Sequence, residues 1–565
     1  LNLVHYRAFR GFDIRGLQES LSHLGLSRLG KAEAHLLASL QMTKNILEGF
    51  IDPGRIHVKQ TFLGIAQGNA LLTRHTDALL GARPQKRPVR IMVTQPTETA
   101  MHSELVTEMV QSGMDIARIN CAHDTPETWK AIMGNTQRAN QELGKEGKVC
   151  MDLGGPKIRV GTIYKGSNMV KYKPAGDENG IPREGGELFL ISQTSENSNS
   201  GKNTLVLPGE WINCLQPGST LKFMDGRGKL RKLKIRSLFE GGAIAYGKKT
   251  AYLKKGLELT TKHREGKKSA LIKEVHFTTN RFLSLRPGDI LRMENDAATE
   301  GGNFPQTDVS KPRISCTSAA IYTFVRIGER VLFDDGKIGG KIIALYSHSM
   351  EIQITHAKAT GGILKEDKGI NFPDTDLKIN GLTKIDKGNL PFVAAHADIV
   401  NLSFVNRGED VEELLKELDR IPQGRDLGII LKIETKSGIA NLTEILLTGM
   451  RSYPMGLMIA RGDLAVECGW ENMAMIQEEM LSLCMAAHIP VIWATQVLEN
   501  LAKKGIPSRP EITDAAMSQR AECVMLNKGP HIVEAIRLLD HILTTMSQYQ
   551  YKKSPILPIM ETFRP

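Results

Sequence analysis

The feature that most constrains the fold is an alternation of short apolar runs and amphipathic segments on both sides of a long interruption. Such alternation is typical of parallel strands joined by helices. Eight strands in this order are the number that closes a parallel barrel, so we predict an α/β fold, a (β/α)8 TIM barrel. The predicted strands span residues 91–94, 116–120, 149–153, 398–405, 428–434, 456–463, 491–496 and 523–528.

The interruption between the third and fourth predicted strands is rich in Gly and Lys and contains turn dipeptides such as Asp-Gly, which favours small β-domains. It also repeats itself. "PGSTLKFMDGRGKLRKLKIRS" from residue 217 resembles "IGERVLFDDGKIGGKIIALYS" from residue 327, a shift of 110 residues. We therefore predict two inserted β-domains, at 161–263 and 264–373. A single irregular domain is the alternative.

The chain on either side of the barrel has a different pattern. "SRLGKAEAHLLASLQMTKNILEGFI", at 27–51, places apolar residues at helical spacing, so we predict a helical N-terminal region. "GARPQKRP" then reads as a linker. The predicted divisions are residues 1–88 for the helical region, 89–160 and 374–548 for the two parts of the barrel, and 549–565 for a C-terminal tail.

The composition bears on where in the cell the protein is found. No run of eighteen apolar residues occurs, and the first eighteen residues lack the apolar core of a signal peptide. The seven cysteines are scattered without a C-x-x-C pair, which favours reduced thiols and a cytoplasmic protein. We expect no membrane partner.

The net charge of +11 favours an anionic partner, either phosphorylated metabolites or nucleic acid, although a generally basic protein explains it equally well. The first inserted domain is the most basic part, with "KLRKLKIR" and "KHREGKKS". No nucleic-acid motif or aromatic stacking platform accompanies these lysines. We interpret them as a solvated β surface and do not expect nucleic acid as a partner.

Several predicted strands end in charged residues, although burying an unpaired charge is costly. Barrel strands deliver their C-terminal residues to one face, where active sites of this architecture lie. Two carboxylates there would suit Mg²⁺ or Mn²⁺, and cations would suit a phosphate group. A ring of salt bridges is the alternative. The strand-end residues are Arg118, Asn120, Asp152, Lys432, Glu434, Asp463 and Thr495.

A set of motifs in this chain resembles the pyruvate kinase family, in family order, between about residues 88 and 542. The motifs are "GMDIARINCAHD", "MDLGGPKIRVG", "VLFDDGKIGG", "KGINFP", "ILKIETKSGI", "MIARGDLAVE", "VIWATQVLEN" and "PSRPEITDAAM". The resemblance implies the glycolytic transfer of a phosphoryl group from phosphoenolpyruvate to ADP, which gives pyruvate and ATP. It also implies that an inserted β-domain acts as a lid, and the second inserted domain, at 264–373, matches the family's lid better than the first.

The resemblance assigns roles to individual residues. Glu434 and Asp463 would hold Mg²⁺ or Mn²⁺, and Lys432 would stabilise the phosphoryl group in flight and the developing enolate. Arg118 would bind the phosphoryl group, and Thr495 would help to place the proton that converts enolate to pyruvate. The remaining implied residues are Ala460, Arg461, Gly462 and Asp463, whose backbone would receive the substrate carboxylate, and Arg159, His123 and Ser403 in supporting positions.

The resemblance also bears on potassium. Asn120 and Asp152 match ligands of the family's monovalent-ion site. The serine position of that site holds Ala122, which has no side-chain oxygen, and Leu153 can offer only its backbone carbonyl. Lys157 stands where the family usually has an acidic residue. We expect its tethered ammonium to replace the ion, so that potassium is not required. A solvent-facing Lys157 is the alternative.

The chain departs from the family pattern at four places. It has "VTQP" after the first strand, "LNKGPHI" after the eighth, and Asp124 after His123. The family's C-terminal effector domain has no counterpart after residue 550, so we expect no sugar-phosphate activation. Two alternative functions stay open, a metal-enolate lyase acting on a pyruvate-type ligand and a non-catalytic sensor of phosphorylated metabolites. Homo-oligomerisation is left open.

Overall fold

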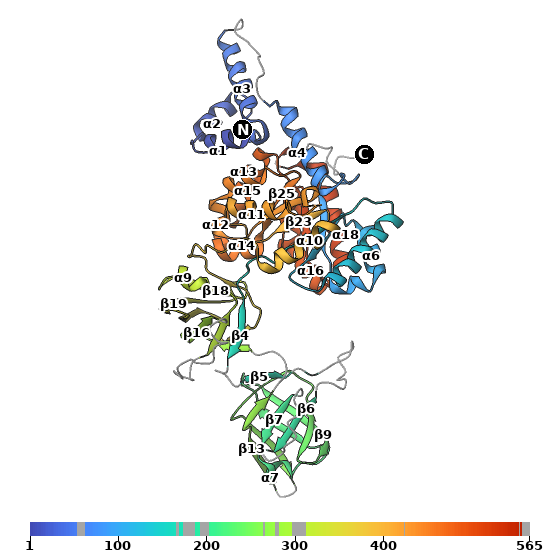
Figure 1. Cartoon of the computed structure of the whole chain (residues 1–565), viewed down its shortest axis with the longest axis vertical. Coiled ribbons are helices and arrows are strands. Elements are labelled where there is room, and N and C mark those ends of the chain that lie inside the picture. Colours follow the sequence, from blue (N-terminus) through green and yellow to red (C-terminus); the bar gives the residue numbers. More distant parts are fainter. Residues whose placement is uncertain are drawn as a thin grey trace. The chain divides into compact units, whose positions relative to one another are not determined.

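The chain forms two compact units, residues 1–157 with 379–565 and residues 158–378 (Figure 1). No helix in the described part is long and apolar enough to cross a membrane, and all seven cysteines have free thiols. The computed structural model describes residues 1–52, 63–164, 169–172, 174, 187–192, 203–263, 266–276, 282–295, 312–422, 424–552 and 554–555.

The first unit contains the predicted barrel. Eight parallel strands pair in chain order, and the last pairs with the first to close the barrel. Most of their residues are buried, as expected for parallel strands covered on both faces. The fold class predicted from the alternation is therefore confirmed. The strands are β1 Arg90–Thr94, β2 Ile116–Asn120, β3 Lys148–Asp152, β23 Ile399–Leu402, β24 Gly428–Ile433, β25 Met455–Ala460, β26 Val491–Ala494 and β27 Cys523–Leu526.

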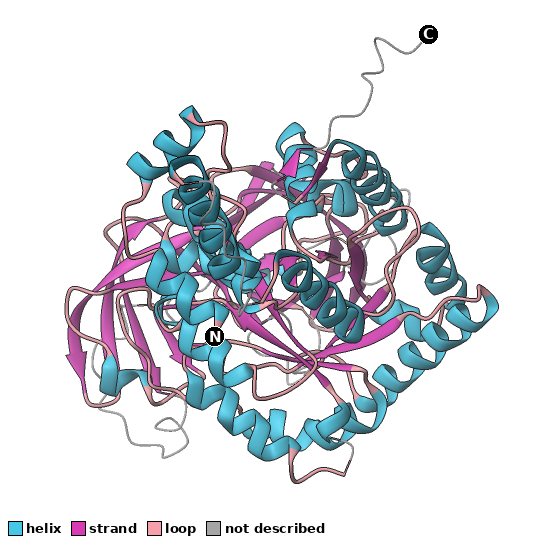
Figure 2. Cartoon of the chain, turned by 90° about the horizontal axis from the view of Figure 1, so that it is seen from above, coloured by secondary structure: helices cyan, strands magenta, loops and turns pink. Residues whose placement is uncertain are grey.

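Helices join the barrel strands, and Figure 2 separates them from the strands by colour. Their apolar faces contribute to one large core cluster with the strands. The helices of the barrel are α5 Ser103–Ser112, α6 Pro126–Glu142, α10 Lys384–His396, α11 Gly408–Leu418, α12 Lys436–Ala440, α13 Leu442–Gly449, α14 Arg461–Cys468, α15 Met473–Ala487, α16 Glu499–Lys504, α17 Arg509–Met517 and α18 Ile532–Tyr549.

The N-terminal region is helical and is tied to the barrel. Leu79 and Leu80, at the end of α4, join a buried cluster that includes residues from all eight barrel strands. Gly81, at a φ of 84°, ends this helix. Asn2 in the first helix donates to the carbonyl of Ala486 in α15. The helices are α1 Asn2–Phe9, α2 Arg15–His23, α3 Leu36–Ile51 and α4 Ile65–Leu80.

The second unit contains two sheets whose five inner strands match in order, β8-β9-β10-β6-β7 in the first and β18-β19-β20-β16-β17 in the second. The first has the order β13-β12-β8-β9-β10-β6-β7-β14, and the second β22-β18-β19-β20-β16-β17-β4. In each, one pair is parallel (β6 with β7, β16 with β17) and the other neighbouring pairs are antiparallel where the register is known. The 110-residue repeat therefore corresponds to a repeated chain topology. The first sheet comprises β6 Glu187–Ser192, β7 Thr204–Leu207, β8 Thr220–Met224, β9 Leu230–Phe239, β10 Gly242–Tyr246, β12 Glu258–His263, β13 Gly266–Leu271 and β14 Glu274–His276.

The second sheet comprises β4 Val160–Tyr164, β16 Ile290–Asn295, β17 Arg313–Cys316, β18 Arg330–Phe333, β19 Ile338–Tyr346, β20 Ser349–His356 and β22 Ile370–Asn371. Two-stranded pieces accompany each sheet, formed by β5 Met169–Tyr172 with β11 Ala251–Lys254, and by β15 Phe282–Leu285 with β21 Gly362–Lys365. Each copy also has a one-turn helix, α7 Gly209–Ile212 and α9 Ile321–Phe324.

Strand pairing differs from the predicted division between the inserted domains. β13 and β14 lie beyond residue 263, yet they pair with β12 and β7 of the first sheet. β4, near residue 161, pairs with β17 of the second sheet. The predicted boundary at 263 thus falls between two paired strands. Sequence spacing missed this because a boundary is defined by long-range pairing, which the local pattern does not report.

Candidate active site

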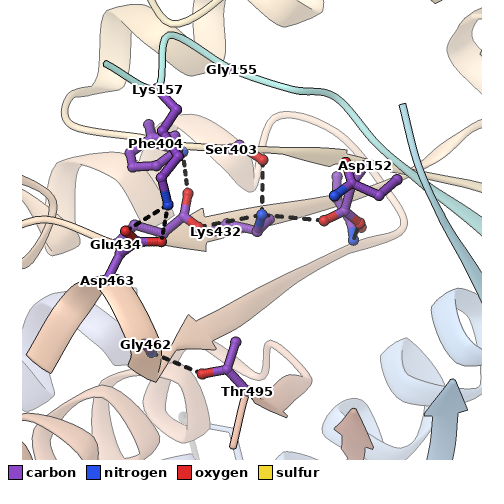
Figure 3. Close-up of polar contacts among 12 residues, drawn as sticks. Asp152, Gly155, Lys157, Ser403, Phe404, Lys432, Glu434, Gly462, Asp463 and Thr495 are labelled. Carbon is purple, nitrogen blue, oxygen red and sulfur yellow. Dashed lines mark hydrogen bonds and ion pairs between the residues drawn. The ribbon is translucent and has the colours of Figure 1, made fainter. Parts of the chain in front are cut away.

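Four buried charged residues gather where barrel strands end. Figure 3 shows three of them, Asp152, Lys432 and Glu434. Arg118 and Asp152 lie on β2 and β3, Lys432 lies on β24, and Glu434 follows β24 directly. Buried charges are stable only when each has partners. The contacts of these four side chains therefore define the site.

Asp152 is the carboxylate that contacts both cations of the site, Arg118 and Lys432. We call these three residues the cationic side of the site. Arg118 donates to its two oxygens, from Nε at 3.0 Å and from Nη2 at 2.5 Å. Lys432 Nζ lies 3.2 Å from Asp152 Oδ2, and the Asn401 amide also donates to the carboxylate. Burial alone would raise the pKa of Asp152, but the charges of Arg118 and Lys432 outweigh it and lower the pKa to about 2. Asp152 is thus ionised at neutral pH and holds both cations in place.

Lys432 lies between Asp152 and Glu434. Its Nζ donates to Ser403 Oγ at 2.9 Å and lies 3.4 Å from Glu434 Oε1. Ser403 in turn donates its hydroxyl proton to the carbonyl of Leu153 at 2.8 Å. The oxygen of the hydroxyl is therefore oriented to accept from Lys432. Burial lowers the pKa of Lys432, but Glu434 and Asp152 outweigh burial and raise it. Lys432 is therefore a permanent ammonium.

Glu434 and Asp463 form the anionic side. Glu434 Oε2 accepts from the Phe404 amide at 2.7 Å. Burial raises the pKa of Glu434; Lys432 opposes this shift and the negative charge of Asp463 adds to it. Asp463 lies in the first turn of α14, and Lys157 Nζ reaches its two oxygens at 2.8 and 2.9 Å. The same ammonium lies 5.5 Å from the centroid of the Phe404 ring. The two carboxylates therefore form a negatively charged site that already attracts one cation, the ammonium of Lys157.

This donor set fits a hard divalent cation. Glu434 and Asp463 supply carboxylate oxygens and lie close enough for one charge to affect the other. Among the described residues, no group of three or more His, Cys, Asp and Glu side chains is arranged to hold a metal. A metal here would take its other ligands from water or substrate oxygens, which is the usual habit of Mg²⁺.

A second polar contact joins the ends of β25 and β26. The Gly462 amide donates to Thr495 Oγ1 at 2.8 Å. Thr495 has a φ of 65°, and Phe404, beside Glu434, has a φ of 57°. A left-handed backbone is uncommon for these residue types and concentrates at functional sites. Ala460 is buried and forms the N-cap of α14. The backbone at Ala460 therefore sets where α14 begins and where Gly462 lies.

The predicted residue Arg461 is directed at protein groups. Its guanidinium makes two contacts with Asp514, at 2.5 and 2.8 Å, and donates to the carbonyls of Ala494 and Thr495. Its side chain thus braces the chain beside Thr495, which leaves the backbone of α14 as the part of this segment open to a role in binding.

Three other predicted residues make local contacts. Asn120 accepts from the amide of Ala122 at 3.0 Å. His123 is exposed, and its carbonyl accepts from the Trp129 indole. Arg159 belongs to the other compact unit, where it donates to the carbonyl of Asp367. These contacts leave the suggested roles of Asn120, His123 and Arg159 as predictions.

The structure adds residues that the sequence reasoning did not select. Asn401 and Phe404 contact Asp152 and Glu434, and Thr94 accepts from Arg118 at 2.8 Å. Asn401 had a detectable signal, because it is a polar residue inside the apolar run of β23. Gly155 has a φ of 68°, and a Cβ there would lie 2.9 Å from Cβ of Ser403. A glycine is therefore required for the chain to pass beside Ser403.

The sequence matches the family profile described as "Pyruvate kinase, barrel domain" over residues 86–234 and 267–531. It is 34% identical to pyruvate kinase from Geobacillus stearothermophilus over 243 residues, which are 42% of this chain and 40% of the relative. It is 35% identical to "Pyruvate kinase PKLR" from Rattus norvegicus over 226 residues, 39% of this chain and 37% of the relative.

The pyruvate kinase of Hypocrea jecorina is 33% identical over 220 residues, 38% of this chain and 39% of the relative. The aligned part thus spans about two fifths of the length of these relatives. The family profile, in contrast, covers well over half of this chain. Together with the closed barrel and its strand-end charges, this match shows that the chain belongs to the pyruvate kinase family.

Proposed function

We propose that this chain is a pyruvate kinase, which transfers the phosphoryl group of phosphoenolpyruvate to ADP. One observation carries the proposal: the buried ammonium of Lys432 is fixed between Asp152, Ser403 and Glu434 at the strand-end face of the barrel. Phosphoryl transfer depends on positioning and charge neutralisation more than on covalent help from the protein. A pre-positioned cation beside a carboxylate pair is suited to that task.

The cationic side would act on the phosphoryl group and the enolate. Asp152 holds Arg118 by two hydrogen bonds and keeps it beside Lys432, so neither cation needs to reorganise during transfer. Lys432 would neutralise the negative charge on the oxygen that phosphorus leaves. Arg118 would orient the phosphoryl oxygens.

The anionic side would hold Mg²⁺ or Mn²⁺ through Glu434 and Asp463. When bound, such an ion neutralises charge on the phosphoryl group and on the enolate oxygen. Glu434 must be ionised to bind it, although burial favours its neutral form. Phe404 favours the ionised form, because its amide donates to the carboxylate.

Thr495 and the start of α14 would handle the rest of the substrate. Thr495 Oγ1 accepts from the Gly462 amide, so its own proton is free to donate toward the substrate. That arrangement suits a residue that helps to place a proton on the enolate. Amide groups in the first turn of α14, which begins at Arg461, are suited to receive the substrate carboxylate.

We further infer that potassium is not required. The contact of Lys157 with both oxygens of Asp463 supports the role of a built-in cation, in place of a solvent-facing side chain. The test is turnover in potassium-free buffer with a tetraalkylammonium counter-ion. Activity comparable to that in potassium supports the inference, and strong activation by added potassium contradicts it.

The proposed reaction is tested by coupled pyruvate release with phosphoenolpyruvate, Mg²⁺ and each nucleoside diphosphate in turn. Pyruvate formation that requires a diphosphate supports the proposal and reveals the nucleotide preference. Pyruvate formation without a diphosphate would indicate a lyase- or phosphatase-like reaction. Binding of phosphoenolpyruvate without any turnover would indicate a metabolite sensor.

A further inference from the structure

The outer face of the first inserted sheet carries a group of exposed lysines. Side chains alternate between the two faces of a strand. On β8, Leu221 and Phe223 point into the domain core, so the residues between and beside them point outward. The same alternation holds on β9, β12 and β13. The outward residues that we call the lysine face are Lys222, Lys232, Lys234, Lys262 and Lys267.

Strand register brings these lysines together. Lys222 lies directly opposite Lys232, and Lys262 lies directly opposite Lys267. Like charges in directly opposed positions destabilise a sheet. None of the five lysines makes a salt bridge with another described residue. The arrangement therefore costs stability without a compensating ion pair.

Protection of a sheet edge does not explain the lysine face. Lysines on edge strands prevent edge-to-edge aggregation, and this accounts for Lys267 on the edge strand β13. Lys222, Lys232 and Lys234, however, lie on β8 and β9, which are interior strands with neighbours on both sides. A different reason is needed for these three.

Exposed apolar side chains lie at the end of the same strands. Met224 is directly opposite Leu230, one outward position beyond the Lys222–Lys232 pair, and they are 52% and 59% exposed. Leu271, at the end of β13, is 56% exposed and lies opposite Glu258, an exposed acid at this end. We call Met224, Leu230 and Leu271 the apolar rim. Lysines beside protruding apolar groups match a surface that is anionic outside and apolar beneath.

The second inserted sheet provides an internal comparison, because its strand order matches. In the second sheet, Leu332 lies opposite Gly339. This pair takes the place of the Lys222–Lys232 pair, on the outward side of the strands and next to the hairpin end. The next outward pair is Arg330 opposite Lys341, and Arg330 is bound to Asp374. The fold itself therefore does not require a lysine face, which is a feature of the first copy.

We propose that the lysine face and the apolar rim bind the surface of a lipid bilayer that contains anionic headgroups. The lysines supply attraction to the headgroups, and the rim inserts at the boundary of the acyl region. Single-stranded nucleic acid fits less well, because it calls for a series of aromatic side chains. Strand pairing places one aromatic side chain beside these lysines, because Tyr246 lies opposite Lys234. A membrane was not expected as a partner from the sequence, because the strand register that groups these lysines is not visible there.

The test is co-sedimentation of the full chain with vesicles of phosphatidylcholine alone and of phosphatidylcholine with phosphatidylserine. We expect binding to the anionic vesicles only, and loss of binding at high salt as the charges are screened. The variant K222Q/K232Q/K234Q should bind on the order of 100-fold more weakly. The control K341Q/K358Q/K378Q removes the same charge from exposed lysines outside the first sheet and should bind like the unaltered chain.

A second variant, L230S/L271S, tests the apolar rim. It should weaken vesicle binding while the salt dependence remains. Thermal unfolding followed by circular dichroism confirms that each variant is folded. Equal binding to neutral and anionic vesicles, or an equal loss in both lysine variants, would overturn the proposal. Tight binding of single-stranded RNA without vesicle binding would overturn it in favour of a nucleic-acid surface.

Discussion

The barrel and the first inserted sheet both concentrate charge, but they arrange it in opposite ways. In the barrel, Asp152 is buried and contacts both Arg118 and Lys432. On the inserted sheet, Lys222 and Lys232 face each other in solvent, and neither makes a salt bridge with a residue that the structure describes. Buried charges must be paired for the domain to fold, so their positions are fixed. Exposed charges are screened by water and salt, so they tolerate repulsion and stay available to a partner.

The largest effect should follow from removing the hub of the buried network. Asp152→Asn leaves Arg118 and Lys432 buried with less negative charge, which should cost about 3–5 kcal/mol of unfolding free energy. The measurement is urea unfolding followed by circular dichroism. The matched control is Asp426→Asn, at an exposed aspartate of the barrel unit, which should change stability by no more than about 0.5 kcal/mol. A similar small change in Asp152→Asn would show that the network is not coupled.

Lys432→Met tests whether the same network serves turnover. Loss of a pre-positioned charge at the reacting group should lower kcat by about 10²–10³. Pyruvate release at saturating phosphoenolpyruvate and ADP measures this effect. Lys416→Met, an exposed lysine on α11, should keep normal turnover. Full activity of Lys432→Met would separate the buried network from catalysis.

The carboxylate pair should decide metal affinity. Glu434→Gln and Asp463→Asn each remove one of two carboxylates, so Mn²⁺ should bind more than about 10-fold more weakly in each variant. Electron paramagnetic resonance of free Mn²⁺ gives the affinity independently of turnover. Normal Mn²⁺ affinity in both variants would place the metal elsewhere.

Acid should weaken the barrel through Asp152. The pKa of this carboxyl is lowered in the folded chain to about 2 from its ordinary value of 3.8, because Arg118 and Lys432 favour the ionised form. Its contribution to stability is therefore complete above about pH 4 and is lost as the pH falls toward 2, a difference of about 2 kcal/mol. The measurement is the pH dependence of urea unfolding in the unaltered chain and in Asp152→Asn. The same loss in both would assign it to other carboxyls.

The smallest effect should come from the exposed side of the comparison. Lys232→Thr removes the repulsion with Lys222 and should stabilise the first inserted domain by a few tenths of a kcal/mol, about the lower end of cross-strand pair energies. Thermal unfolding at low and high salt measures this change, which should shrink as salt screens the charges. A destabilised variant would mean that Lys232 has a structural role.

Much of the barrel was predictable because its strands are continuous apolar runs. The fifth strand was predicted at 428–434 and spans Gly428–Ile433. The strand-end charges were also predictable, since the C-terminal ends of barrel strands share one face. Arg118, Asp152, Lys432 and Glu434 do meet there. In both cases a local pattern and a general rule of the architecture were sufficient.

Contacts between residues distant in the chain could not be predicted in the same way. The position of Lys157 on Asp463 and that of Asn401 on Asp152 depend on packing across the barrel. The end of the first inserted domain and the lysine face depend on which residues pair across strands. The amino-acid sequence by itself determined the barrel, the repeat and the residues at the strand ends, because these are local periodicities. Only the tertiary structure decided which charges neutralise one another and which are left exposed, because that depends on register and distance in space.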